Sequence, residues 1–397
     1  MSDSGQTGAT GQPGKSGDTS PEQQPTSQSQ PQAQREYDSF VVETPATPQT
    51  ALADSAGSSL GSTGPSQTDT TETAALSQAA PTPSATPAAA TTATPNATPA
   101  PTQQAGQREI VRSIHYRLSY IVQNPERGPQ GAIVLLHDLP GGAFVWQSIL
   151  PQIAATGKAV YAFDMLGYGD SDHPWPSDTT IWGQADCLLY AFQTLGLRDI
   201  TLVGIGLGGA VAQVLTTRLY REEVARLALI NTYAYLDAYA PNWPLPDMEK
   251  HQDPEAGHTM KLDVVMNELR QTVPLASAKG LSKDRLTTYV NEWNSNVGKH
   301  MLMQHVRLML PDYINAVASD VTKLAIPVLV VWGELDQVTP LALGQRLARE
   351  TATARLEVLP GVGHLALDDA PAQVARLLAD FAVAQQPATT ARSAAAR

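Results

Sequence analysis

The sequence predicts an α/β protein built on a mostly parallel β-sheet, with only part of the chain folded. Between residues 110 and 383, short continuous apolar runs alternate with longer segments of helical spacing. Five of these runs are followed by loops rich in glycine or acidic residues. The segments before and after this region contain almost nothing apolar, so they have no core to bury.

The two ends of the chain are predicted to be disordered. Residues 1–106 are dominated by Ser, Thr, Pro, Ala, Gln and Gly, and residues 387–397 are also low in complexity. Repeated Pro-Thr and Pro-Ala steps favour extended, solvated backbone. We therefore expect one folded domain over residues 107–386.

The folded region begins with an antiparallel pair of strands and continues as alternating strands and helices. Parallel strands buried on both faces form continuous apolar runs, whereas amphipathic helices repeat every 3–4 residues. The expected strands are 110–122 (the antiparallel pair), 132–136, 159–163, 200–203, 227–230, 326–331 and 356–359, and the expected helices are 181–197, 207–220, 342–349 and 371–383. Repetition of strand, helix and strand predicts a parallel sheet covered on both faces.

One segment interrupts the alternation. Residues 233–319 contain several helical patterns, many aromatic residues and methionines, and no clear strand. They lie between two expected strands, which predicts an inserted helical cap. Its Trp243, Met266, Trp293 and Met301 are expected to form the core of the cap or to line a pocket.

Composition and charge exclude several function classes. The net charge is −12 and basic clusters are missing, which argues against binding nucleic acid or a membrane surface. The single cysteine, Cys187, lies in an apolar helical stretch and is expected to be a buried core residue. The start of the chain lacks a basic, then apolar, leader, and no apolar run is long enough to span a membrane. We therefore expect a cytoplasmic protein.

The expected strand ends carry the residues of chemical interest, because functional groups gather at the carboxyl ends of parallel strands. The loops that follow the strands are 137–142 (HDLPGG), 164–172 (DMLGYGDSD), 204–209 (GIGLGG), 332–340 (WGELDQVTP) and 360–371 (PGVGHLALDDAP). In this order and spacing they resemble the α/β-hydrolase fold family, in the cap-bearing branch of epoxide hydrolases, haloalkane dehalogenases and carbon–carbon bond hydrolases. The resemblance covers residues 110–383 and implies an eight-stranded sheet.

The same resemblance implies which residues form the site. WGELD would supply the acid, Asp336, and GVGH the base, His364. A histidine base needs a carboxylate to orient it and to stabilise its cation. The backbone N–H groups of Leu139 and Leu207 would form the oxyanion hole. His137 is expected to be structural.

The nucleophile position departs from the family pattern. The family places a serine, aspartate or cysteine at the centre of G-x-S-x-G, on a sharp strand-to-helix turn known as the nucleophile elbow. In this chain Gly204 and Gly208 stand at the two glycine positions of the pattern, and Gly206 stands at the nucleophile position. Glycine tolerates the turn but offers no side chain for attack. Ser171 follows a different strand and is not expected to replace the nucleophile.

A binding site for a dinucleotide is a competing interpretation of the same loop. Residues Gly204–Gly209 also match G-x-G-x-x-G after a strand and before a helix. That hypothesis requires an acidic residue at the end of the next strand, where this chain has Asn231 and Thr232. No cofactor is therefore expected. The remaining histidines show no metal-ligand spacing, so no metal is expected either.

Three functions remain open from the sequence. The glycine at the nucleophile position favours a pseudoenzyme, a hydrolase-like protein that binds a ligand without covalent chemistry. The retained Asp336 and His364 favour a hydrolase, lyase or oxygenase in which His364 activates water or substrate. The glycine is also consistent with a recent change in an ordinary hydrolase. A small apolar or ester-like molecule in the cap pocket is the expected ligand, and the N-terminal tail could engage a protein partner.

Overall fold

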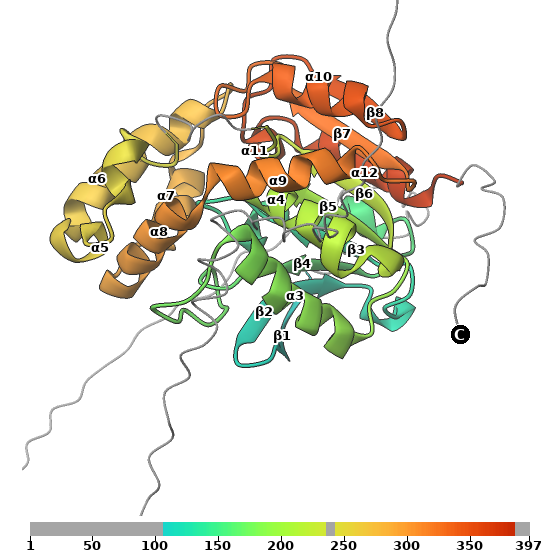
Figure 1. Ribbon diagram of the computed structural model, residues 1–397, viewed down its shortest axis with the longest axis horizontal. Helices are drawn as coiled ribbons and strands as arrows, with labels where there is room; N and C mark the ends of the chain where they lie inside the picture. Colours follow the sequence, from blue (N-terminus) through green and yellow to red (C-terminus); the bar gives the residue numbers. More distant parts are fainter. Residues whose placement is uncertain (1–105, 236–242, 386–397) are drawn as a thin grey trace, which may run out of the picture. The chain divides into compact units, whose positions relative to one another are not determined.

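The computed structural model describes residues 106–235 and 243–385, all of which belong to one compact unit (Figure 1). The two predicted tails, Gly106 apart, lie outside the described residues. Within the described part, the order of strands and helices along the chain follows the order predicted from the sequence.

The sheet has eight strands, in the order β1-β2-β4-β3-β5-β6-β7-β8. The strands are β1 (Gln107–Arg112), β2 (Arg117–Gln123), β3 (Ile133–Leu136), β4 (Val160–Phe163), β5 (Ile200–Ile205), β6 (Val224–Ile230), β7 (Val328–Gly333) and β8 (Ala354–Leu359). Strand β2 pairs antiparallel with β1 and β4, and the other pairs are parallel. The predicted eight-stranded, mostly parallel sheet is confirmed.

Burial along the strands explains why the central ones are so apolar. Every residue of β3, β4, β5 and β7 is buried, as expected for parallel strands covered on both faces. By contrast, β1 at one edge is exposed at five of its six positions, and β8 at the other edge is buried at only one of its six. The core therefore lies around the middle of the sheet, and the carboxyl ends of β3, β5 and β7 converge there.

The helices cover both faces of the sheet. They are α2 (Leu150–Ala154), α3 (Ile181–Leu195), α4 (Leu207–Val214), α10 (Leu341–Glu350), α11 (Ala366–Asp369) and α12 (Pro371–Val383). The chain moves in one direction across the sheet from β3 to β4, and in the other from β4 to β8. Because parallel crossovers are right-handed, α2 lies on the face opposite α3 and α4. Helix α12 packs against α2. On the other face α3 packs against α4 (Figure 1).

Helix α4 is shorter than the predicted helix 207–220. It passes at Leu215–Leu219 (η3) into one turn of π-helix, closed by a 2.7 Å hydrogen bond from the Tyr220 N–H to the Leu215 carbonyl. Short 3-10 turns lie at η1 (Pro125–Arg127), η2 (Ala143–Trp146), η4 (Arg221–Glu223), η5 (Met248–Gln252) and η6 (Val273–Ala276). The periodicity of the sequence could not distinguish the π turn from regular helix, since its residues are apolar in the same positions.

Between β6 and β7 the described residues form helices and no strand, as predicted. The helices of this insertion are α5 (Ala256–Thr259), α6 (Leu262–Thr272), α7 (Lys283–Asn291), α8 (Asn296–Leu308) and α9 (Pro311–Val321). Helices α7 and α8 are N-capped by Ser282 and Ser295, whose hydroxyls accept hydrogen bonds from the backbone of the first turn. Its tryptophans and most of its methionines are buried, so they form core. Among the described helices, none is both long and apolar enough to cross a membrane.

Candidate active site

The turn between β5 and α4 has the backbone of a sharp elbow. Gly206 precedes the helix at φ 53° and ψ −119°, a conformation that side-chain-bearing residues rarely adopt. The flanking glycines serve close packing. A Cβ at Gly204 would lie 2.3 Å from the Gly208 carbonyl oxygen, and one at Gly209 would lie 2.0 Å from Thr232 Oγ1. The glycines at positions 204, 206 and 209 are thus required by the turn itself.

A second loop lies directly beside this turn. Strands β3 and β5 are parallel neighbours in which Leu136 pairs with Gly204. Asp138 and Gly206 each follow two residues after this pair, so the register brings their loops together. A Cβ at Gly206 would lie 2.0 Å from Asp138 Cγ. The Asp138 carboxylate therefore occupies the space that a side chain at position 206 would need.

Both oxygens of Asp138 are held by hydrogen bonds. The backbone N–H of Leu207 donates to Oδ1 at 2.6 Å, and Nε2 of His364 lies 2.9 Å from Oδ2. The side chain of Asp138 is 10% exposed and that of His364 is fully buried. One carboxylate thus joins the start of α4 to the loop after β8.

His364 is held on its other side by Asp336. Its Nδ1 lies 2.9 Å from Asp336 Oδ2, so the two predicted residues are brought together. Asp336 also accepts hydrogen bonds from the Thr339 N–H, at 2.9 Å, and the Thr339 hydroxyl, at 2.7 Å. The Asn231 side chain donates to the His364 carbonyl at 2.8 Å. These contacts fix both the ring and the carboxylate before any ligand binds.

The charge state of His364 follows from its two carboxylates. Burial alone would lower the pKa of His364, but Asp336 and Asp138 outweigh it and raise that pKa from 6.5 to about 10. At neutral pH His364 is therefore an imidazolium between two carboxylates. In this resting arrangement Nε2 donates to Asp138 and has no lone pair with which to take a proton from water.

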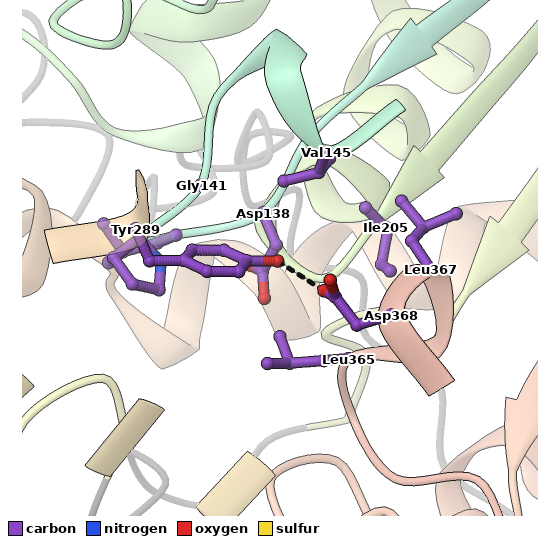
Figure 2. A pocket seen from close by; sticks show the side chains of 10 residues that line it. Asp138, Gly141, Val145, Ile205, Tyr289, Leu365, Leu367 and Asp368 are labelled. Carbon is purple, nitrogen blue, oxygen red and sulfur yellow. Dashed lines mark hydrogen bonds between the residues drawn. The ribbon is translucent and has the colours of Figure 1, made fainter. Parts of the chain in front are cut away.

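A pocket opens on Asp138. It is lined by residues of the loop after β3, by Ile205 at the end of β5, by Tyr289 of the insertion, and by residues around α11, as Figure 2 shows; they are Asp138, Leu139, Pro140, Gly141, Val145, Ile205, Tyr289, Leu365, Leu367 and Asp368. Most of this lining is apolar. The hydroxyl of Tyr289 donates to Asp368 Oδ2 at 2.7 Å, and the guanidinium of Arg285 contacts Oδ1 of the same carboxylate at 2.5 Å.

Two aromatic residues flank the imidazole of His364. The ring of Tyr233 lies 6.2 Å away and that of Trp243, at the start of the insertion, 5.3 Å away, between centroids. Both side chains are buried. Trp243, expected to be cap core or pocket lining, thus contacts the candidate base.

The other residues singled out from the sequence lie around this site or away from it. His137 is fully buried, with Nδ1 2.9 Å from the Asp138 carbonyl and Nε2 accepting the Met165 N–H at 3.0 Å, which is a structural role. Ser171 donates to the Asp164 carbonyl, away from His364. Leu139 lines the pocket, and the Leu207 N–H already has its acceptor.

Cys187 is only partly buried, because it lies at the edge of the packed face of α3 rather than inside the core.

Asp138 is the residue that the sequence prediction missed. HDLPGG was recognised as a strand-end loop, but only its histidine and a backbone N–H were given roles. The acid two residues beyond β3 fills the space left by the missing side chain at position 206. The sequence indicates this only once β3 and β5 are known to be neighbours in register.

The geometry opposes the dinucleotide hypothesis. A phosphate at the start of α4 would need the Leu207 N–H, which is hydrogen-bonded to a carboxylate. Asp138 would also repel the phosphate. Among the described residues, no group of three or more His, Cys, Asp or Glu side chains is arranged to hold a metal ion.

Comparisons with known proteins agree with the fold. A family model described as the alpha/beta hydrolase fold matches residues 131–371. The chain is 27% identical over 267 residues to the alpha/beta hydrolase domain-containing protein VTE7 of Arabidopsis thaliana, covering 66% of this chain and 76% of that protein. It is 31% identical over 120 residues to a haloalkane dehalogenase of Mycobacterium marinum, covering 30% and 39% of the two chains. A crystal structure of an alpha/beta hydrolase fold protein from Burkholderia ambifaria superposes with a TM-score of 0.60 at 24% identity, covering 69% of this chain and all of that one.

Proposed function

Because the chain belongs to the α/β-hydrolase fold family, we propose that it is a hydrolase whose reactive centre is the group Asp138, His364 and Asp336, without a serine step. The observation that carries this proposal is the position of His364, 2.9 Å from a carboxylate on each side and next to a pocket. The retained acid and base would have no chemical use in a protein that had lost turnover.

His364 would act as the base toward water during turnover. Asp336 orients the ring through Nδ1 and stabilises the imidazolium that forms, which is the role of the acid in hydrolase triads. A positioned base of this kind contributes roughly 10²–10⁴-fold to a rate. The Leu207 N–H would stabilise negative charge that develops beside it.

The ligand expected here is a small and largely apolar molecule. Leu139, Val145 and Ile205 line the pocket, while Asp138 supplies its reactive end. A haloalkane dehalogenase among the relatives supports a substrate of this kind. A protein partner for the N-terminal segment stays a prediction.

A panel of bond types tests the proposal. The full-length protein is assayed with short-chain aryl esters, primary bromoalkanes and terminal epoxides, beside His364→Gln and the control Asp320→Asn. Asp320 lies on α9, where it pairs with Arg218 and Lys323. We expect the wild type and Asp320→Asn to turn over a member of the panel, and His364→Gln to lose at least 10²-fold. Turnover that survives in folded His364→Gln would refute the proposal.

Ligand binding without turnover is the second candidate, and it was the function first predicted from Gly206. It is favoured by the resting contact between His364 Nε2 and Asp138, because a nitrogen that donates to Asp138 cannot accept a proton from water. A wild type that binds panel members, measured by calorimetry, yet hydrolyses none would establish this candidate instead.

A further inference from the structure

The loop after β3 carries at Asp138 a carboxylate that fills the place of the side chain missing at Gly206 in the adjacent loop. One loop carries an acid, the other lacks a side chain, and strand register places them side by side. A Cβ at Gly206 would lie 2.1 Å from Asp138 Oδ1 and 2.3 Å from Oδ2. Only a glycine at position 206 leaves room for the carboxylate at its present position.

The contacts of Asp138 are those that a reacting carboxylate needs. Oδ1 accepts the N–H at the start of α4, and Oδ2 faces the imidazole of His364. The carboxylate is also part of the pocket wall, whereas Asp336, on the far side of the ring, is fully buried. Of the two carboxylates that hold His364, only Asp138 can reach a bound molecule.

We infer that Asp138 is the nucleophile of this hydrolase, supplied by the loop after β3, and that its substrates carry a leaving group on saturated carbon. This inference rests on the proposed function and names its substrate class. A carboxylate that attacks a carboxylic ester gives a reactive anhydride, whereas displacement at saturated carbon gives a stable ester. The carboxylate therefore selects haloalkanes or epoxides over ordinary esters.

The first step balances as a displacement. A carboxylate oxygen of Asp138 forms a bond to the substrate carbon, and the bond from that carbon to the leaving group breaks with both electrons on the leaving group. With a haloalkane the products are an Asp138 alkyl ester and a free halide. With an epoxide the leaving oxygen stays on the same ester as an alkoxide, which takes the proton of His364. Oδ1, which faces the Leu207 N–H, becomes the carbonyl oxygen of that ester.

The second step uses the base that the first step releases. Esterification removes the charge of Asp138, one of the two carboxylates that raise the pKa of His364, so the imidazolium can release its proton to solvent. His364 then takes a proton from water, and the hydroxide adds to the ester carbonyl carbon, with the negative charge on Oδ1 beside the Leu207 N–H. Collapse breaks the bond to the alkyl oxygen, and the alcohol leaves with a proton from His364. The Asp138 acid proton returns to His364, so the sum is alkyl halide and water to alcohol, halide and a proton.

The resting ion pair is explained by this sequence of steps. A protonated His364 cannot activate water before Asp138 has reacted, so water cannot attack prematurely. Loss of the Asp138 charge is the event that makes the base available. The two conditions that seemed to oppose activity, a missing elbow side chain and a blocked base, are both accounted for by one residue.

The test follows the oxygen atom in a single turnover. Excess wild-type protein is mixed with 1-bromobutane in H₂¹⁸O, and the butanol and the peptide containing Asp138 are analysed by mass spectrometry. We expect ¹⁸O in the Asp138 carboxylate and unlabelled oxygen in the first-turnover butanol. Label in the butanol with none in Asp138 would overturn the nucleophile while leaving the proposed hydrolase in place. The same experiment with 1,2-epoxybutane tells whether the leaving group is a halide or a ring oxygen.

Two variants complete the test. His364→Gln, with its fold checked by near-ultraviolet circular dichroism, is expected to accumulate a butyl adduct on Asp138, and Asp138→Asn is expected to form none. Release of bromide by Asp138→Asn at the wild-type rate would overturn the inference. Hydrolysis of aryl esters but not of bromoalkanes or epoxides would overturn it too, whereas a wild type inactive on the whole panel would instead refute the proposed function.

Discussion

Two clusters of buried carboxyl groups lie at the carboxyl edge of the sheet, and they differ in the charge that their carboxyl groups carry. At the first, Asp138 and Asp336 share the cation of His364. At the second, which we call the β4-end cluster, Asp164 pairs with Arg108, and Glu292 lies beside Asp164 and accepts the Gly169 N–H at 2.7 Å. Burial, and then the charges of Asp164 and Asp170, raise the pKa of Glu292 from 4.5 to about 8.

The difference lies in the cation. In the first site the imidazolium sits between both carboxylates, so the charges are compensated at close range. In the second, Arg108 contacts Asp164 and reaches Asp170 at 3.1 Å, and Glu292 is held largely neutral at pH 7. A buried carboxyl group is thus ionised where a cation contacts it and compensates its charge, and it stays neutral and only forms hydrogen bonds where no cation contacts it. The first site suits chemistry, while Glu292 joins the insertion to the core.

The largest effect should come from removing one partner of the charged site. Asp138→Asn leaves the His364 cation with a single carboxylate, and breaking a buried pair from one side costs about 3 kcal/mol or more. Urea unfolding at pH 7 measures this loss. The double variant Asp138→Asn with His364→Gln should lose less than the sum of the two single variants. Additive losses would mean that the two side chains do not interact.

A smaller but sharper effect is expected at the elbow. Gly206→Ser places a Cβ about 2 Å from the Asp138 carboxylate, so the variant should lose roughly 1–3 kcal/mol from overpacking. The double variant Gly206→Ser with Asp138→Gly should lose less than the sum of the two single variants, because Asp138→Gly removes the carboxylate that the new Cβ meets. If Gly206→Ser alone were as stable as the wild type, Asp138 would not occupy the elbow space.

The pH dependence of stability separates the two sites. The pKa of Glu292 is higher in the folded than in the unfolded chain, so its contribution is fully present below about pH 4.5 and is lost as pH rises through about 8. Glu292→Gln should therefore match the wild type near pH 4 and become more stable than the wild type as the pH rises to 8, because the glutamine never has to ionise. Thermal unfolding midpoints across this range measure the effect. Equal pH profiles would show that Glu292 ionises freely in the folded protein.

The smallest effect is expected at the solvent-facing edge of the β4-end cluster. Asp170 is 67% exposed in its ion pair with Arg108. Exposed ion pairs contribute about 0–1 kcal/mol, so Asp170→Asn should change stability by less than about 0.5 kcal/mol. Asp164→Asn, which removes a buried partner of the same arginine, is the matched variant and should cost more. Equal losses for both would remove the distinction between buried and exposed acids on which the comparison rests.

Most of the fold could be predicted from the sequence because apolar periodicity reports burial directly. The runs at β3, β4 and β7 are apolar because each strand is covered on both faces, and helix α12 was predicted with its bounds. The pairing of Asp336 with His364 followed from the family resemblance. Asp138 could not be placed, because its role depends on which strands are neighbours and on a clash at Gly206. Neither fact is local in the sequence. The charge state of Glu292 was hidden for the same reason, since its partners come from Gly169 and Asp164 far along the chain.

The most direct test of the account is the titration of His364 by NMR in ¹⁵N-histidine-labelled protein, compared with Asp138→Asn. We predict that the His364 ring nitrogens keep imidazolium shifts through pH 8 in the wild type, since Asp336 and Asp138 raise the pKa of His364 to about 10. In Asp138→Asn the same signals should become those of neutral imidazole at a clearly lower pH. A wild-type His364 that titrates near pH 6.5, unchanged by Asp138→Asn, would show that Asp138 is not its partner and would contradict the account.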